Sequence, residues 1–183
     1  MISLVKIYED IDQEFDKDFD GFGNDLASAV KDELKNNKKD IDKLEGDKVE
    51  EVVATTILGY ILLSNTVVGM LAKFAKKMFI KYNFGKGEEA AKKIEDFAHN
   101  NEKAFQAPIR RVVSMFTKNQ NKINNISEAL YALVILLMAG QAGGNAASYL
   151  SKSKWLEGGL YGLKTAVKGA EVNTIVKNIV SSI

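Results

Sequence analysis

Three aspartates at alternate positions form the pattern in this chain that is best suited to chemistry. Asp16, Asp18 and Asp20 precede a glycine, Gly21. Carboxylate oxygens at alternate positions are the hard ligands that calcium prefers, and a glycine permits the tight turn that brings them together. The spacing therefore raises the hypothesis of a calcium site near the N-terminus.

The pattern resembles the opening of the calcium loop of EF-hand proteins, but only over residues 16–21. The twelfth position of such a loop carries a bidentate acidic residue, and in this chain that position is Ala27. The aspartates also continue a longer alternation of acidic residues that starts at Asp10. We therefore favour a different interpretation and predict no metal site.

The charge distribution supports this second interpretation, an acidic arm. Residues 1–51 carry 16 acidic residues against 8 lysines, a net charge of −8, whereas residues 73–128 carry a net charge of +6. Three aromatic residues lie within the acidic stretch: Phe15, Phe19 and Phe22. Aromatic side chains provide large apolar contact areas. We expect the arm to dock on a basic, apolar surface, either of a partner or of residues 73–128 in a neighbouring copy.

The composition argues against catalysis. The chain has no cysteine, which excludes disulfides, zinc–thiolate sites and thiol chemistry. Its one histidine, His99, is expected near a helix end, where such residues more often interact with the helix dipole. No neighbouring group completes a nucleophile set around it. We predict a non-enzymatic protein without catalytic residues, cofactors or metal ligands.

Four basic residues in the middle of the chain are candidates for phosphate binding: Arg110, Arg111, Lys118 and Lys122. Nucleic-acid-binding domains usually have an isoelectric point above about 9, whereas the whole chain has one near 7.8. The glycine pairs at 143–144 and 158–159 match no phosphate-binding loop. We predict a solvated helix face and do not expect nucleic acid as a partner.

The elements that position these residues are predicted to be helices. The chain contains a single proline, Pro108, and apolar residues recur at steps of three and four. A break is expected at Gly85 and Gly87, with a new helix starting at Glu88. At Pro108 either a new helix starts or one long helix bends. A helix cap is expected at Asn124–Ser127.

Whether the protein spans a membrane or forms a soluble bundle depends on two uncharged runs. Residues 52–72 and 129–151 contain no charged side chain, and both are long enough to cross a bilayer. Two spans would place the basic residues 73–128 on the cytoplasmic side. The spacing of Gly140 and Gly144, repeated at Gly158 and Gly162, permits close helix contacts in a bilayer or in a soluble bundle. Membrane spans and buried core helices therefore remain two alternatives.

Together these features predict an all-α fold of about five or six helices around a central apolar helical hairpin. Residues 1–45 would form an acidic N-terminal helical arm, and residues 46–183 a bundle that contains the apolar helices 52–72 and 129–150. We expect a structural protein that assembles with itself or with larger partners, for example in a virus or phage particle. The alternative is a small two-span membrane protein, pore-forming or anchoring. No signal peptide is recognised, so cytoplasmic synthesis is expected.

Overall fold

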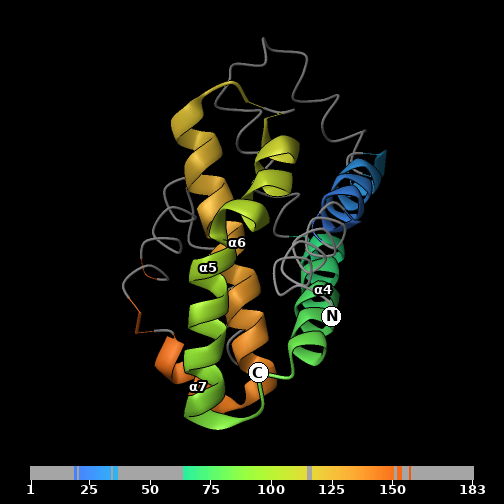
Figure 1. The fold of residues 1–183 in the computed structure, drawn as a ribbon. Helices are drawn as coiled ribbons and strands as arrows, with labels where there is room; N and C mark the ends of the chain where they lie inside the picture. The colour runs from blue at the N-terminus through green and yellow to red at the C-terminus, as the bar shows by residue number, and fades with distance from the viewer. Residues whose placement is uncertain are drawn as a thin grey trace, which may run out of the picture.

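The computed structural model describes residues 19, 21–33, 35–36, 64–114, 117–150, 152–153 and 157. These residues form five helical segments and the turns between them, without a strand, so the predicted all-α class is confirmed. The helices are a helical stretch within residues 19–36, named the N-terminal segment from here on, α4 (Asn65–Tyr82), α5 (Gly87–Val113), α6 (Gln120–Ala142) and α7 (Gly144–Leu150) (Figure 1).

Helix α6 is the centre of the bundle. Every residue from Ala129 to Leu136 is buried, so this part of the helix has no polar face. Helices α4, α5 and α7 all pack against α6, and Figure 1 shows α5 running alongside it. Burying one large aliphatic side chain contributes about 1.5–3 kcal/mol. The central apolar helix that the sequence predicted is therefore present, and it holds the other helices together.

The helix predicted over the first uncharged run does not end at Ala72. Helix α4 begins at Asn65, where the Ser64 side chain accepts a hydrogen bond from the Val67 amide, and it continues past Ala72 to Tyr82. It therefore carries four lysines: Lys73, Lys76, Lys77 and Lys81. Residues 52–63 lie outside the described part, as does the predicted domain boundary at residues 45–46. The described residues of this run therefore form the first turns of an amphipathic helix. The serine cap sets where that helix begins.

The second uncharged run is divided at Gly143. This residue has φ +108°, a conformation that L-residues rarely adopt, and it separates α6 from α7. The predicted cap at Asn124–Ser127 was wrong. The Asn119 side chain caps α6 instead, accepting hydrogen bonds from the amides of Asn121 and Lys122. The helix therefore begins about one turn earlier than expected, and Ser127 lies inside it.

The turn between α4 and α5 confirms the predicted break. Asn83, Gly85 and Gly87 all have positive φ values, so the chain reverses direction within a few residues. Between them, Phe84 is buried, with its ring centroid 5.4 Å from that of Phe97 on α5. This aromatic contact fixes the angle at which α5 leaves the turn.

Helix α5 continues through Pro108 as one long helix, which resolves the alternative left open by the sequence. A proline inside a helix removes one backbone hydrogen bond and bends the axis, and Figure 1 shows this helix bent along its length. The predicted apolar stripe is buried at Ile94, Phe97, Phe105, Ile109 and Val112. The bend brings part of this stripe toward the N-terminal segment.

Candidate protein-binding site

The N-terminal segment docks on the bundle through aromatic rings. Phe19 and Phe22 are each 2% exposed. The Phe22 ring centroid lies 4.3 Å from that of Phe74 on α4, and the Phe19 centroid lies 5.1 Å from that of Phe105 on α5. Phe74 and Phe105 contact each other at 5.4 Å. The segment thus bridges two helices that both pack on α6.

The rest of the contact is aliphatic. Leu26, Ala29 and Val30 are buried and follow Phe22 at steps of three and four residues, the period of a helix face. The N-terminal segment is therefore amphipathic, with one apolar face toward the bundle and exposed polar residues such as Asn24 and Ser28 between the buried positions. This arrangement is the helix-in-groove mode by which many proteins recognise helical partners.

A close backbone contact fixes the register of this docking. If Gly23 carried a Cβ atom, that atom would lie 2.6 Å from Cβ of Pro108. Real side chains do not approach so closely, so any larger residue forces the segment away from the bend of α5. We call the surface formed by Phe74, Phe105 and Pro108 the docking surface.

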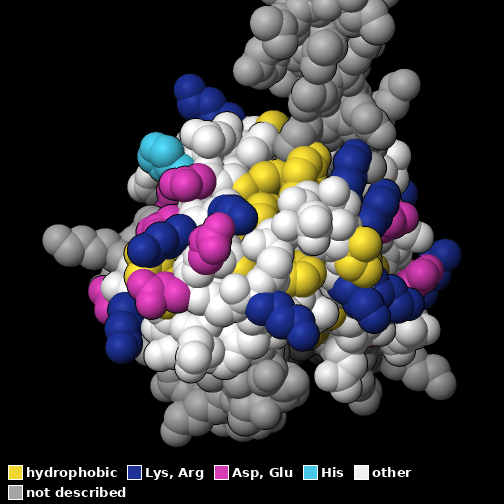
Figure 2. Space-filling model, turned by 60° about the horizontal axis from the view of Figure 1, so that its bottom comes forward, with side chains coloured by type: hydrophobic (Ala, Val, Ile, Leu, Met, Phe, Trp, Pro, Cys, Tyr) yellow, Lys and Arg dark blue, Asp and Glu magenta, His cyan; other side chains and the backbone are white. Residues whose placement is uncertain are grey.

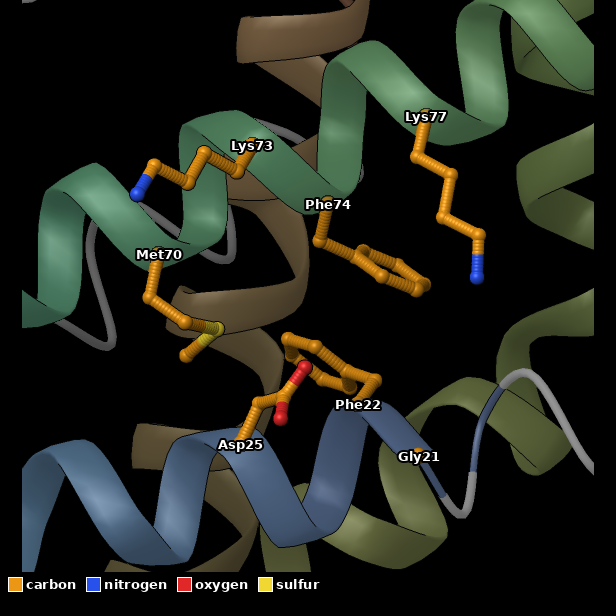
Figure 3. A pocket seen from close by; sticks show the side chains of 7 residues that line it. All are labelled: Gly21, Phe22, Asp25, Met70, Lys73, Phe74 and Lys77. Atoms are coloured by element: carbon orange, nitrogen blue, oxygen red, sulfur yellow. The ribbon is translucent and has the colours of Figure 1, made fainter.

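An open groove of about 220 Å³ runs between the N-terminal segment and α4. Figure 3 shows its lining: the rings of Phe22 and Phe74 lie close together, while Asp25 on the segment faces Met70 on α4. Lys73 and Lys77 stand on the α4 side of the groove and are exposed. The groove marks the edge of the docked interface, with an acidic group on the segment and basic groups on the bundle.

The docking surface is connected to the core through Tyr131 of α6. Its ring lies 4.9 Å from that of Phe105, and its hydroxyl donates a hydrogen bond to the Ala98 carbonyl of α5. Burial raises the pKa of Tyr131 well above its usual value, with a smaller contribution from the negative charge of Glu102. The neutral phenol thus joins α5 to α6 at the level of the aromatic cluster.

Beside the cluster, polar side chains form a ladder along α5. Arg110 donates to the Gln106 side-chain oxygen at 3.2 Å, and Gln106 donates to Glu102 at 3.1 Å. Gln106 is buried, so these bonds satisfy its amide on both sides. The ladder spans the region of Pro108 and supports the helix where a backbone hydrogen bond is lost.

The predicted candidate residues are placed as follows. Asp16 and Asp18, like Asp20 and Phe15, lie outside the described residues, so the calcium hypothesis stays untested. Within the described ranges no group of three acidic or histidine side chains is arranged to hold a metal ion. Phe19 and Phe22 lie against Phe74 and Phe105 of the same chain, and docking on a partner or a neighbouring copy stays a prediction.

His99 is not at a helix end, so that prediction was wrong. It lies in the middle of α5, because the helix continues through Asn100 and Asn101 for more than three further turns. Its side chain is exposed. Arg111 and Lys118 are exposed near the junction of α5 and α6, whereas Arg110 is half-buried in the ladder. The four basic residues therefore do not all form one solvated face.

The molecular surface combines basic and apolar groups. Figure 2 shows Lys and Arg side chains, with Asp and Glu side chains among them, around several hydrophobic patches on one face. Ile80 of α4 is 65% exposed, the most exposed large apolar side chain in the described part of the chain. Within the same residues, α6 alone is long and apolar enough to cross a membrane, and 78% of its apolar window is buried in the bundle.

Comparison with protein-family models, with curated proteins and with solved structures found no match for this chain.

Proposed function

We propose that this chain is a non-enzymatic assembly protein, which associates with itself or with larger protein partners through apolar helix faces. The observation that carries the proposal is the docking of the N-terminal segment. An amphipathic helix that is distant in sequence contacts the bundle through Phe19 and Phe22, which insert against Phe74 and Phe105. Buried aromatic anchors of this kind dominate the energetics of protein interfaces.

Charge supports the same proposal. The first 51 residues carry a net charge of −8 and residues 73–128 carry +6. Opposite charges on the two sides of an interface increase association rates and select partners more than they raise affinity. A protein whose acidic first 51 residues and basic middle region attract each other is suited to ordered association with further copies.

Helix α6 favours a second candidate, a membrane-associated protein. Its 23 residues correspond to about 34 Å, and the hydrocarbon core of a bilayer is about 30 Å thick. Burial of this helix by α4, α5 and α7 is what the core helix of a soluble bundle shows, and such a helix has the same composition.

Fractionation of the expressed chain tests both candidates. For the assembly protein we expect the chain in the soluble fraction without detergent. Its mass by light scattering should be two or more times the 20.2 kDa of one chain. Retention in the membrane pellet after a wash at high pH would favour the second candidate. A soluble monomer that captures no further copy at high concentration would contradict self-association.

A further inference from the structure

We propose that the docking surface of one copy accepts the N-terminal segment of a second copy, so that two chains exchange this helix. The inference rests on the proposed assembly function and names the partner and the surface. The contacts that hold the segment are made by side chains of Phe19, Phe22 and Leu26. The same contacts form whether the segment and the docking surface belong to one chain or to two.

The length of sequence between the two parts is sufficient for exchange. Residues 37–63 lie between the segment and the Ser64 cap of α4. An extended chain of that length spans up to about 90 Å. A long connection lowers the effective concentration of the segment at its own docking surface, since that concentration falls as the connection lengthens. A neighbouring copy then competes more effectively.

Gly23 argues for a copy of this chain as the partner, against an unrelated helix. Any residue with a side chain at this register meets Cβ of Pro108 at 2.6 Å. The docking surface therefore selects a helix with phenylalanines one and four residues before a glycine, and Phe19, Phe22 and Gly23 have this spacing. Helices with a larger residue at this position clash with Pro108, and this clash makes the docking surface specific for the segment of this chain.

The charge of the chain adds attraction between copies. The first 51 residues carry a net charge of −8 and residues 73–128 carry +6, so these two regions attract each other between copies as well as within one chain. The same complementarity is visible at the edge of the interface, where Asp25 lines the groove together with Lys73 and Lys77 (Figure 3). Exchange keeps the acidic and the basic residues on opposite sides of the same groove.

The absence of cysteine makes the test direct, since any introduced cysteine is unique. One full-length variant carries Asp25→Cys and a second carries Lys73→Cys, two exposed positions that line opposite sides of the groove. The two variants are unfolded together in urea, refolded by dilution and treated with a short bismaleimide. Exchange predicts a covalent heterodimer of twice 20.2 kDa.

Two controls make each outcome decisive. The double variant Asp25→Cys/Lys73→Cys, refolded alone and dilute, must be cross-linked within one chain, which verifies refolding and the proximity of the two sites. Adding Gly23→Ala to the Asp25→Cys chain should lower the heterodimer yield about tenfold, because overpacking weakens the docked contact. A yield unchanged by Gly23→Ala indicates random collision and overturns the exchange.

Failure of the exchange is distinguishable from failure of the assembly function. If light scattering gives a multiple of the chain mass while no heterodimer is cross-linked, copies associate through another surface and only the exchange is refuted. If the chain is monomeric and no heterodimer is cross-linked, self-association is refuted as well.

Discussion

Gly23 and Pro108 are in direct contact although 84 residues lie between them: a Cβ on Gly23 would be 2.6 Å from Cβ of Pro108. The proline bends α5, and the missing side chain of the glycine lets the N-terminal segment approach that bend. Two residues that both disfavour helix interiors thus make one close helix contact.

This contact predicts the effect of adding a methyl group to the segment. Gly23→Ala should lower the free energy of unfolding by about 1–3 kcal/mol, the usual cost of overpacking. Gly21→Ala is the matched control, because a Cβ there meets nothing within 4 Å. In a helix that change should be neutral or stabilising by up to about 1 kcal/mol. Urea unfolding of both variants measures the difference, and equal stabilities would refute the contact.

Phe105 is expected to be the most important side chain of the docking surface. It is fully buried and contacts Phe19, Phe22 and Phe74, as well as Tyr131. Phe105→Ala should destabilise the protein by about 3–5 kcal/mol. The control is Phe79→Ala, since Phe79 is only partly buried and should cost clearly less. The energetic role assigned to the cluster fails if the two variants unfold at the same urea concentration.

Tyr131 should make stability depend on alkaline pH. Its hydroxyl donates to the Ala98 carbonyl, so Tyr131→Phe should cost about 0.5–1.5 kcal/mol at neutral pH. Burial raises its pKa in the folded state. The neutral form is therefore favoured by folding, and this contribution is complete below the unfolded pKa of about 10 and is lost as pH rises above it.

Urea unfolding of the wild type and Tyr131→Phe at a series of pH values measures this effect. The stability difference between them should be constant up to about pH 9 and should change sign or shrink above about pH 10, where only the wild type must keep a buried phenol neutral. A difference that stays constant across the series would show that Tyr131 titrates alike in both states.

Replacing Ser127 is expected to stabilise the protein, whereas the substitutions of Gly23, Phe105 and Tyr131 are expected to destabilise it. Its side chain is fully buried in α6, and its Oγ has no hydrogen-bond partner within the described part of the chain. A buried unpaired hydroxyl costs about 1–3 kcal/mol, so Ser127→Ala should raise the melting temperature. Ser114→Ala is the control, since Ser114 is exposed and should change stability by less than about 0.5 kcal/mol. A destabilised Ser127→Ala would indicate an unseen partner for the hydroxyl.

Much of the fold follows from local patterns in the sequence. The helical period predicted that Ile94 and Phe105 share a buried face, and the uncharged residues after Glu128 predicted a central helix. Helix starts were predicted less well. Several polar residues precede α4 and α6, and only the fold determines that Ser64 and Asn119 are the ones whose side chains cap.

The docking surface could be predicted only in part. Phe15, Phe19 and Phe22 were predicted to anchor the arm on a partner or on residues 73–128 of a neighbouring copy. The structure shows Phe19 and Phe22 on Phe74 and Phe105 of the same chain. The contact between Gly23 and Pro108 could not be predicted, since it depends on the bend of α5 and on the angle of a distant helix. Periodicity within one helix holds no information about which distant backbone approaches it.

The order of residues along the chain has a consequence for biosynthesis. The N-terminal segment leaves the ribosome before α4, α5, α6 and α7, yet the surface that covers its apolar face includes Phe105 and Pro108, which are made much later. During that interval Phe19 and Phe22 lack the complete docking surface of their own chain, and exposed apolar groups on nascent chains attract chaperones or neighbouring chains. On a polysome, the nearest completed docking surface belongs to the chain ahead.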